Sequence, residues 1–267
     1  RELLSLLNSN EEQWKFISNE IKDLKKQYSK SSLLGERRTS INLIEEEIVY
    51  KNDYTPPSEP VSIILSSEGW IRCLKGSFED LGEIKFKEED SLFLSIDANT
   101  NDKLVIFCSN GKSYSLNVSD LPSGRGHGAP LKILFDIEEE HSVINIFTYE
   151  KDKKIILSSS LGNGFIIKHQ DMLSSRKSGK AILNIKEGER ASFCKHVDGS
   201  HITIIGENKK MLIFSLDELP EMSKGKGVRL QKYKDSEVLF IKTFNPKEGL
   251  IIDLFRTLEA SRRKNNI

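Results

Sequence analysis

Apolar positions follow two different periods along the chain. Between Trp14 and Tyr28 they recur at alternating steps of three and four, which predicts the apolar stripe of one amphipathic helix. From Val61 onward they alternate or form short runs, which is typical of strands. The predicted strands are 61–65, 92–96, 104–108, 143–147, 155–157, 202–205, 211–214 and 238–241. We therefore expect a mainly β chain preceded by a short α-helical segment.

The helical segment carries a candidate start signal. Asn10 followed by Gln13 has the spacing of a capping box, and Asn10 separates this helix from an earlier apolar stretch at 3–7. A stripe of about four turns is too short for an autonomous coiled coil. The stripe is therefore expected to need a further surface to cover it.

A strand-loop-strand unit recurs roughly every 45 to 50 residues from Val61 onward. Residues 67–72 align with 109–114, and later copies align at 120–122, 171–173 and 218–220. Each of these later copies is followed by a loop rich in glycine and basic residues, at 124–131, 176–183 and 223–230. A repeat of this kind predicts a propeller-like ring or a stack of blades, with about four blades in all.

A proline-rich segment marks a boundary between two parts of the chain. The segment 54–60, Tyr-Thr-Pro-Pro-Ser-Glu-Pro, cannot continue a helix and is expected to link two domains. We predict a helical part at 1–50, a linker at 51–60, the β domain at 61–254 and a basic tail at 255–267. Because the chain begins with Arg1, it is expected to be a piece of a longer protein.

Charge is balanced overall but segregated along the chain. Lys and Arg total 40, as do Asp and Glu. Acids outnumber bases by roughly seven between Glu79 and Glu140, and bases outnumber acids by roughly eight between Lys151 and Lys234. This pattern favours a polyanion bound along one arc of the ring, although solvated charged loops would also keep a β-protein soluble. No apolar run approaches the roughly 20 residues of a membrane span.

Other site chemistries are disfavoured. The Gly124–Gly128 loop lacks the Gly-Lys-Ser/Thr ending of a phosphate loop and leads into a strand. The five histidines show no ligand spacing with Cys or Asp, and the glutamate runs 45–47 and 138–140 are more typical of solvated faces than of metal sites. The cysteines Cys73, Cys108 and Cys194 are expected to be reduced core residues.

Four motifs in register resemble one family. These are 65–72 (Leu-Ser-Ser-Glu-Gly-Trp-Ile-Arg), 120–122 with its 124–128 loop, 176–183, and 218–227 (Glu-Leu-Pro-Glu-Met-Ser-Lys-Gly-Lys-Gly). The domain from Val61 resembles the C-terminal β-pinwheel of the A subunit of bacterial type II topoisomerases, specifically topoisomerase IV (ParC type). Residues 14–24 followed by 35–41 resemble the end of that subunit's breakage-reunion domain.

The resemblance implies a non-catalytic domain that binds and bends double-stranded DNA. It would present a duplex to the cleavage core of an ATP-hydrolysing topoisomerase during decatenation and relaxation. The nucleophilic tyrosine and magnesium carboxylates of that family belong upstream of Arg1, so no catalytic residue and no cofactor are expected in this fragment. The parent enzyme would use Mg²⁺, with ATP on a partner B subunit in an A₂B₂ heterotetramer, in the cytoplasm and associated with the nucleoid.

Two departures from the family pattern matter. No loop carries the full glutamine-basic-basic-glycine-glycine-lysine-glycine box that marks gyrase, which favours topoisomerase IV over the gyrase A subunit. The chain also ends about where a further blade would begin, which leaves open whether the ring is closed.

Candidate DNA contacts lie in the basic loops, where Lys and Arg neutralise phosphates and glycines allow close approach. We predict largely sequence-independent contacts from Arg72, Lys75, Arg125, His127, Arg176, Lys177, Lys180, Lys224, Lys226 and Arg229. The alternative is that the glycines only make turns and the bases are solvated, and for His127 this reading is favoured. A propeller-like protein-interaction scaffold is the alternative function, favoured if the loops scatter over the ring.

Overall fold

The computed structural model describes residues 6–7, 9–36, 57–76, 84–124, 126–232 and 236–250. The chain forms two compact units, Arg1–Tyr54 and Thr55–Ile267. Arg125, most of the expected linker and the basic tail at 255–267 lie outside the described residues. The assignment of 1–50 to an upstream domain stays a prediction.

The first unit contains helix α2 (Asn10–Gln27). Its N-cap is Ser9, whose side-chain oxygen accepts a hydrogen bond from the amide of Glu12 at 3.4 Å. The prediction of Asn10 as the N-cap is therefore wrong by one position. Ser9 and Glu12 have the same capping-box spacing as Asn10 and Gln13, and the helix uses the earlier pair. No residue of α2 is buried, and the predicted apolar stripe is exposed along its length. In the part of the chain that is described, no helix is long and apolar enough to span a bilayer.

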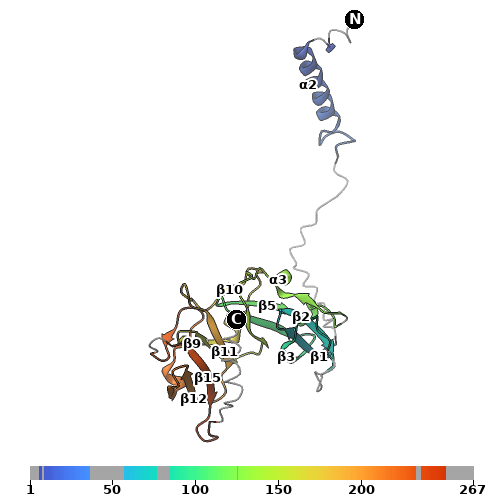
Figure 1. The fold of residues 1–267 in the computed structure, drawn as a ribbon. Helices are drawn as coiled ribbons and strands as arrows, with labels where there is room; N and C mark the ends of the chain where they lie inside the picture. Colours follow the sequence, from blue (N-terminus) through green and yellow to red (C-terminus); the bar gives the residue numbers. More distant parts are fainter. Residues whose placement is uncertain are drawn as a thin grey trace. The chain divides into compact units, whose positions relative to one another are not determined.

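The described residues of the second unit form four antiparallel sheets, or blades, that follow one another along the chain (Figure 1). In the first, β1 (Pro60–Ser66) pairs with β3 (Leu92–Asn99) and β2 (Trp70–Lys75), and β2 with β6 (Ala129–Pro130). In the second, β4 (Lys103–Cys108) pairs with β7 (Val143–Thr148) and β5 (Lys112–Asn117), and β5 with β10 (Lys180–Ala181). In the third, β8 (Lys154–Ser159) pairs with β11 (Ala191–His196) and β9 (Asn163–Lys168), and β9 with β14 (Val228–Arg229). In the fourth, β12 (His201–Gly206) pairs with β15 (Val238–Phe244) and β13 (Met211–Ser215).

All eight predicted strands lie inside observed ones, and the mainly β fold with four blades is confirmed. Short helices follow three of the hairpins and overlap the aligned motifs at 120–122, 171–173 and 218–220. They are η2 (Val118–Asp120), α4 (His169–Met172) and η3 (Leu216–Glu218), while α3 (Leu131–Leu134) follows β6.

The outermost strands are exchanged between blades. β6 follows β5 in the chain but pairs with β2 of the preceding blade, and β10 and β14 likewise pair with β5 and β9. The residue after each short strand buries an apolar side chain and donates its amide to the carbonyl of a hairpin-turn glycine. These bonds join Leu131 to Gly69 (2.9 Å), Ile182 to Gly111 (3.0 Å) and Leu230 to Gly162 (2.8 Å). Each long loop therefore returns to the rim of the blade before it.

The core lies between successive blades in three clusters. Leu104 and Ile106 of β4 pack toward the first blade, whereas Val105 and Phe107 pack toward the third. A strand buried on both faces is apolar at consecutive positions, which explains the uninterrupted apolar runs in the sequence.

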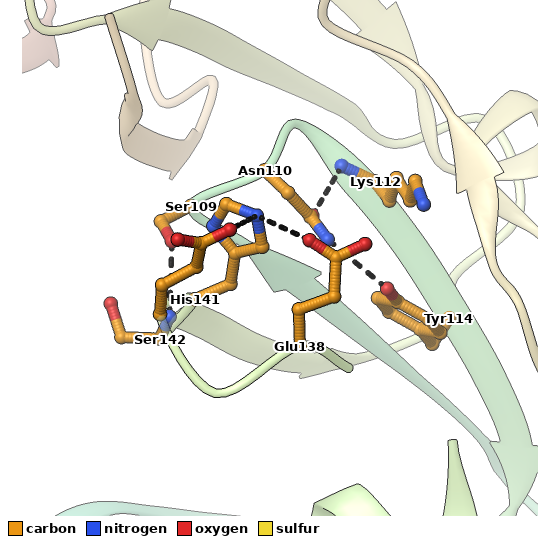
Figure 2. A network of polar contacts seen from close by, with 8 residues as sticks. Ser109, Asn110, Lys112, Tyr114, Glu138, His141 and Ser142 are labelled. Carbon is orange, nitrogen blue, oxygen red and sulfur yellow. Dashed lines mark hydrogen bonds and ion pairs between the residues drawn. The ribbon is translucent and has the colours of Figure 1, made fainter. Parts of the chain in front are cut away.

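The turn of the second blade shows how the hairpin tips are fixed (Figure 2). The side chain of Asn110 accepts from the amide of Lys112 at 3.0 Å and donates to the hydroxyl of Tyr114 at 3.2 Å. Ser109 exchanges two further bonds with Ser142, which precedes β7. The turn is thereby tied to the segment that enters β7.

Candidate nucleic-acid interface

The last glycine of each basic loop is required by the strand exchange. Gly128, Gly179 and Gly227 directly precede the exchanged strands and have φ of 89°, 73° and 75°. A Cβ atom at these positions would lie 2.3 Å from the carbonyl oxygen of Ile71, 2.6 Å from the ring of Tyr114 and 2.2 Å from the carbonyl oxygen of Gly164, respectively. These glycines therefore serve the fold, and their presence alone says nothing about a ligand.

The second and third basic loops meet. The amide of Gly225 donates to the carbonyl of Ile182 at 2.9 Å, and its own carbonyl accepts from the amide of Asn184 at 2.8 Å. The exchanged strand β10 belongs to the second blade and β14 to the third, so the contact joins loops on neighbouring blades. Two loops about 40 residues apart in sequence thus form one surface.

This surface contains an open groove of about 570 Å³ that we name the basic groove. Its charged lining residues are Arg176, Lys180 and Lys224, and no acidic side chain of the described residues lines it. Its remaining lining residues are Leu173, Ser174, Ser175, Gly179 and Ala181. All three basic residues are exposed, and the ammonium group of Lys180 donates to the carbonyl of Asp171. Three cations from two blades therefore face one groove.

The other bases of these two loops have different environments. Lys177 and Arg229 are exposed. Lys226 is half-buried, and its charge acts on Glu189. Burial alone would raise the pKa of Glu189, but hydrogen bonds from Ser159, the amide of Lys186 and Asn163, together with Lys226, lower it. Part of the charge of Lys226 is therefore balanced within the protein.

Arg72 is held inside the first blade. It is only 7 % exposed, and its guanidinium donates to the carbonyl oxygens of Gly126 and Lys85 and lies 5.6 Å from the ring centre of Phe86. Its contact with DNA stays a prediction, and this burial favours a role in fixing the first loop.

Two of the three remaining candidate DNA contacts of the first blade lie in the described residues, and both are exposed. Lys75 is exposed and forms an ion pair of 3.1 Å with Glu59, and His127 is exposed. Arg125 lies outside the described residues. The DNA contacts of these residues also stay predictions.

Some bases of the third blade are paired with acids and are less available to a ligand. Glu221, two residues before the third loop, lies 2.6 Å from Lys154 and 3.0 Å from Lys168, and Arg190 pairs with Glu237 at 2.9 Å. The two lysines lower the pKa of Glu221, and the Glu221 carboxylate raises that of Lys168. The basic groove, in contrast, has no such acid among its lining residues.

One cluster has the composition of a metal site. The ligand atoms of Glu138, Glu140 and His141 lie within 4.8 Å of one another, with His141 Nε2 3.3 Å from Glu138 (Figure 2). The glutamates are exposed, as a solvated face predicts, but their spacing in the sequence does not show that the imidazole of His141 lies beside them. Both glutamates are exposed and nothing else about the cluster points to an ion, so we assign it no role.

The cysteines fit the predicted core positions. All three are free, Cys108 and Cys194 are buried, and Cys73 is half-buried. Burial raises the pKa of Cys108 and Cys194 to about 12, so both are thiols at neutral pH. None of the three contributes to the basic groove.

Radially successive blades that exchange their outermost strands define a β-propeller of the pinwheel type. The model of one family, the DNA gyrase C-terminal domain, beta-propeller, matches residues 102–149, 153–197 and 201–242. The chain belongs to this family.

Similar proteins and a similar solved structure belong to topoisomerase IV. The chain is 39% identical over 253 residues to the A subunit of DNA topoisomerase 4 from Rickettsia felis, which covers 93% of the chain and 34% of that relative. It is 43% identical over 191 residues to the corresponding protein of Caulobacter vibrioides, covering 72% of the chain and 25% of that relative. The structure of the E. coli ParC C-terminal domain matches with a TM-score of 0.66 and 26% identity, over 70% of this chain and 80% of that one. The resemblance to topoisomerase IV A subunits is thereby confirmed, and the chain spans about a third or less of the length of these curated relatives.

Proposed function

We propose that this chain is a non-catalytic DNA-binding and DNA-bending module of a bacterial topoisomerase IV A subunit. The observation that carries the proposal is the basic groove, in which loops of two neighbouring blades bring Arg176, Lys180 and Lys224 together with no acidic lining residue. A duplex lying across neighbouring blade rims would follow their curvature and bend.

The chemistry of the groove favours contacts with phosphates. Guanidinium and ammonium groups neutralise phosphate charge and release counterions, so affinity falls steeply as salt rises. Such contacts position a duplex without reading base edges, which accounts for binding with little sequence preference. The protein-scaffold alternative is less favoured, because two of the three basic loops share one surface instead of scattering over the ring.

The proposal includes a larger assembly. The names of the relatives support a parent type II topoisomerase. We place this domain after a breakage-reunion domain, because residues 14–24 and 35–41 resemble the end of such a domain. A B subunit carrying ATP, an A₂B₂ arrangement, Mg²⁺ in the cleavage core and a cytoplasmic, nucleoid-associated location belong to the same proposal. Gyrase is the weaker alternative, since no loop carries its full basic box.

Fluorescence anisotropy with a duplex of about 40 base pairs, titrated at several salt concentrations, tests the proposal. We expect the dissociation constant to rise steeply with salt and to differ little between unrelated sequences. Energy transfer between dyes at the two duplex ends should increase on binding because the duplex bends. A folded chain that does not bind at low salt would overturn the proposal.

A further inference from the structure

One glutamate bridges two lysines at the edge of the third blade. Oε2 of Glu221 lies 2.6 Å from Nζ of Lys154, and Oε1 lies 3.0 Å from Nζ of Lys168. The two lysines are directly paired in the ladder of β8 and β9, and like charges at such positions repel each other. All three side chains are between 38% and 45% exposed. The site therefore holds a carboxylate between two ammonium groups in contact with solvent.

This arrangement has the chemistry of a phosphate site. Two ammonium groups that converge on two oxygen atoms suit any oxyanion, and each phosphodiester of DNA offers two charged oxygens. Hydrogen bonds from both lysines lower the pKa of Glu221, so the carboxylate occupies the site as an anion at neutral pH. Exposed ion pairs contribute little to stability, because water competes for both partners. A phosphate group can therefore take the place of this carboxylate.

The other blades show that the fold does not need a glutamate at this position. Glu221 directly follows the third of the aligned motifs, and Ser123 and Ser174 directly follow the first two. Each of these three residues lies beside the fourth residue of the adjoining strand, in β9, β2 and β5 respectively. Two blades thus form the same contact with a serine, which leaves the two lysines as the distinctive partners of Glu221.

The same place on the second blade is an open groove of about 490 Å³. Its charged lining residues are Lys103 and Asp120, and Lys103 begins β4 as Lys154 begins β8. This groove shares three lining residues with the basic groove, namely Leu173, Ser174 and Ser175. The position therefore lies next to the proposed DNA path on the second blade, and the third blade places two lysines there.

We propose that Glu221 is an intramolecular competitor of DNA, which occupies a phosphate-backbone site formed by Lys154 and Lys168. A duplex that extends from the basic groove along the third blade places a phosphate between the two lysines and displaces the carboxylate. The displaced carboxylate loses its partners and stays close to the duplex. Glu221 thereby holds the affinity for DNA below the value that the lysines alone would give. The inference rests on the proposed DNA binding and names a residue that limits it.

Neutralising Glu221 tests the competition. In E221Q the amide keeps the shape of the side chain and removes its charge. We expect E221Q to bind a duplex of about 40 base pairs at least about fivefold more tightly than the wild type in fluorescence anisotropy at about 50 mM salt. The slope of log affinity against log salt should steepen by up to about 2, because two more lysines neutralise phosphates. E187Q, which changes the charge equally at an exposed residue of the third blade, should bind like the wild type.

Removing the lysines shows whether the gain belongs to them. K154Q/E221Q/K168Q should lose the gain, whereas K15Q/K22Q/E221Q, which has the same net charge but lacks two lysines of α2, should keep it. Acetylation with an N-hydroxysuccinimide ester, followed by mass spectrometry, gives a second readout. Lys154 and Lys168 should react faster in E221Q than in the wild type, and the duplex should protect both lysines in E221Q.

The outcomes separate this inference from the proposed function. If the wild type binds DNA and E221Q binds no more tightly, the competition is wrong and the DNA-binding proposal stands. An equal gain in E187Q, or a gain that persists in K154Q/E221Q/K168Q, would also overturn the competition. If neither the wild type nor E221Q binds at low salt, with both folded by circular dichroism, both proposals are wrong.

Discussion

A Cβ atom at position 227 would lie 2.2 Å from the carbonyl oxygen of Gly164. Residue 227 precedes β14, the strand that the following repeat contributes to the third blade, and Gly164 belongs to β9, with which β14 pairs. The exchange of strands therefore depends on the absence of a side chain at this residue.

Gly227→Ala should destabilise the β unit more than Gly188→Ala. Both residues have φ near 75°, so alanine costs about 1–2 kcal/mol of backbone strain at either position. At position 227 alanine also clashes with the backbone, and overpacking of this kind lowers the free energy of unfolding by roughly a further 1–3 kcal/mol. At position 188 nothing lies within 4 Å of the added Cβ atom. Denaturant unfolding of the two variants measures the difference. Equal losses would show that the close approach does not constrain the fold.

Arg72→Lys should lower stability, although it preserves the charge. The guanidinium bonds to Gly126 and Lys85 need the planar fork of arginine, and an ammonium group cannot reproduce both. A loss of about 1–3 kcal/mol is expected for buried charged hydrogen bonds. Arg176→Lys, at an exposed position, is the matched control and should melt like the wild type. A melting temperature that is unchanged in Arg72→Lys would assign Arg72 to the surface.

Stability should fall as pH falls below neutrality because of buried His169. Burial, His196 and Lys153 lower its pKa from 6.5 to about 4, so the unfolded chain binds a proton before the folded one does. The stabilising contribution is complete above pH 6.5 and is lost progressively as pH falls toward 4. The pKa of His196 is also lowered by burial, which adds a loss in the same direction.

Urea unfolding at about pH 7.5 and about pH 5.5 measures this effect in a window above the carboxylate titrations, and His169 should account for about 1–2 kcal/mol. His169→Gln should lower stability at both pH values but reduce the difference between them. His127→Gln, at an exposed histidine, should leave the difference unchanged. A wild type whose stability is the same at both pH values would contradict the buried, neutral state of His169.

The fold was largely predictable because its strands are buried on both faces. β4 and β8 read as short apolar runs, and the repeat of these runs predicted four blades. The strand β5 could not be predicted, because its sequence Lys-Ser-Tyr-Ser-Leu-Asn mixes polar and apolar residues. It is a strand because its backbone pairs with β4 and β10. Two-residue strands such as β6 carry no period at all.

The site was predictable in kind but not in arrangement. Sequence placed bases and glycines in the same loops, yet it could not separate buried Arg72 from exposed Arg176. That distinction depends on the returning loop, whose Gly126 carbonyl binds Arg72. It also could not show that Lys224 joins Arg176, because strand exchange between blades brings the two loops together.

Charge reversal within the basic groove measures how much the groove contributes to duplex binding. The groove variant R176E/K180E/K224E is compared with the helix variant K15E/K22E/K25E, which changes the net charge equally at exposed positions of α2. We expect the groove variant to lose most of its affinity for a duplex of about 40 base pairs, and the slope of log affinity against log salt to fall by up to about 3. The helix variant should bind like the wild type. Equal binding by the groove variant and the wild type, with both folded, would show that the duplex does not bind in the basic groove.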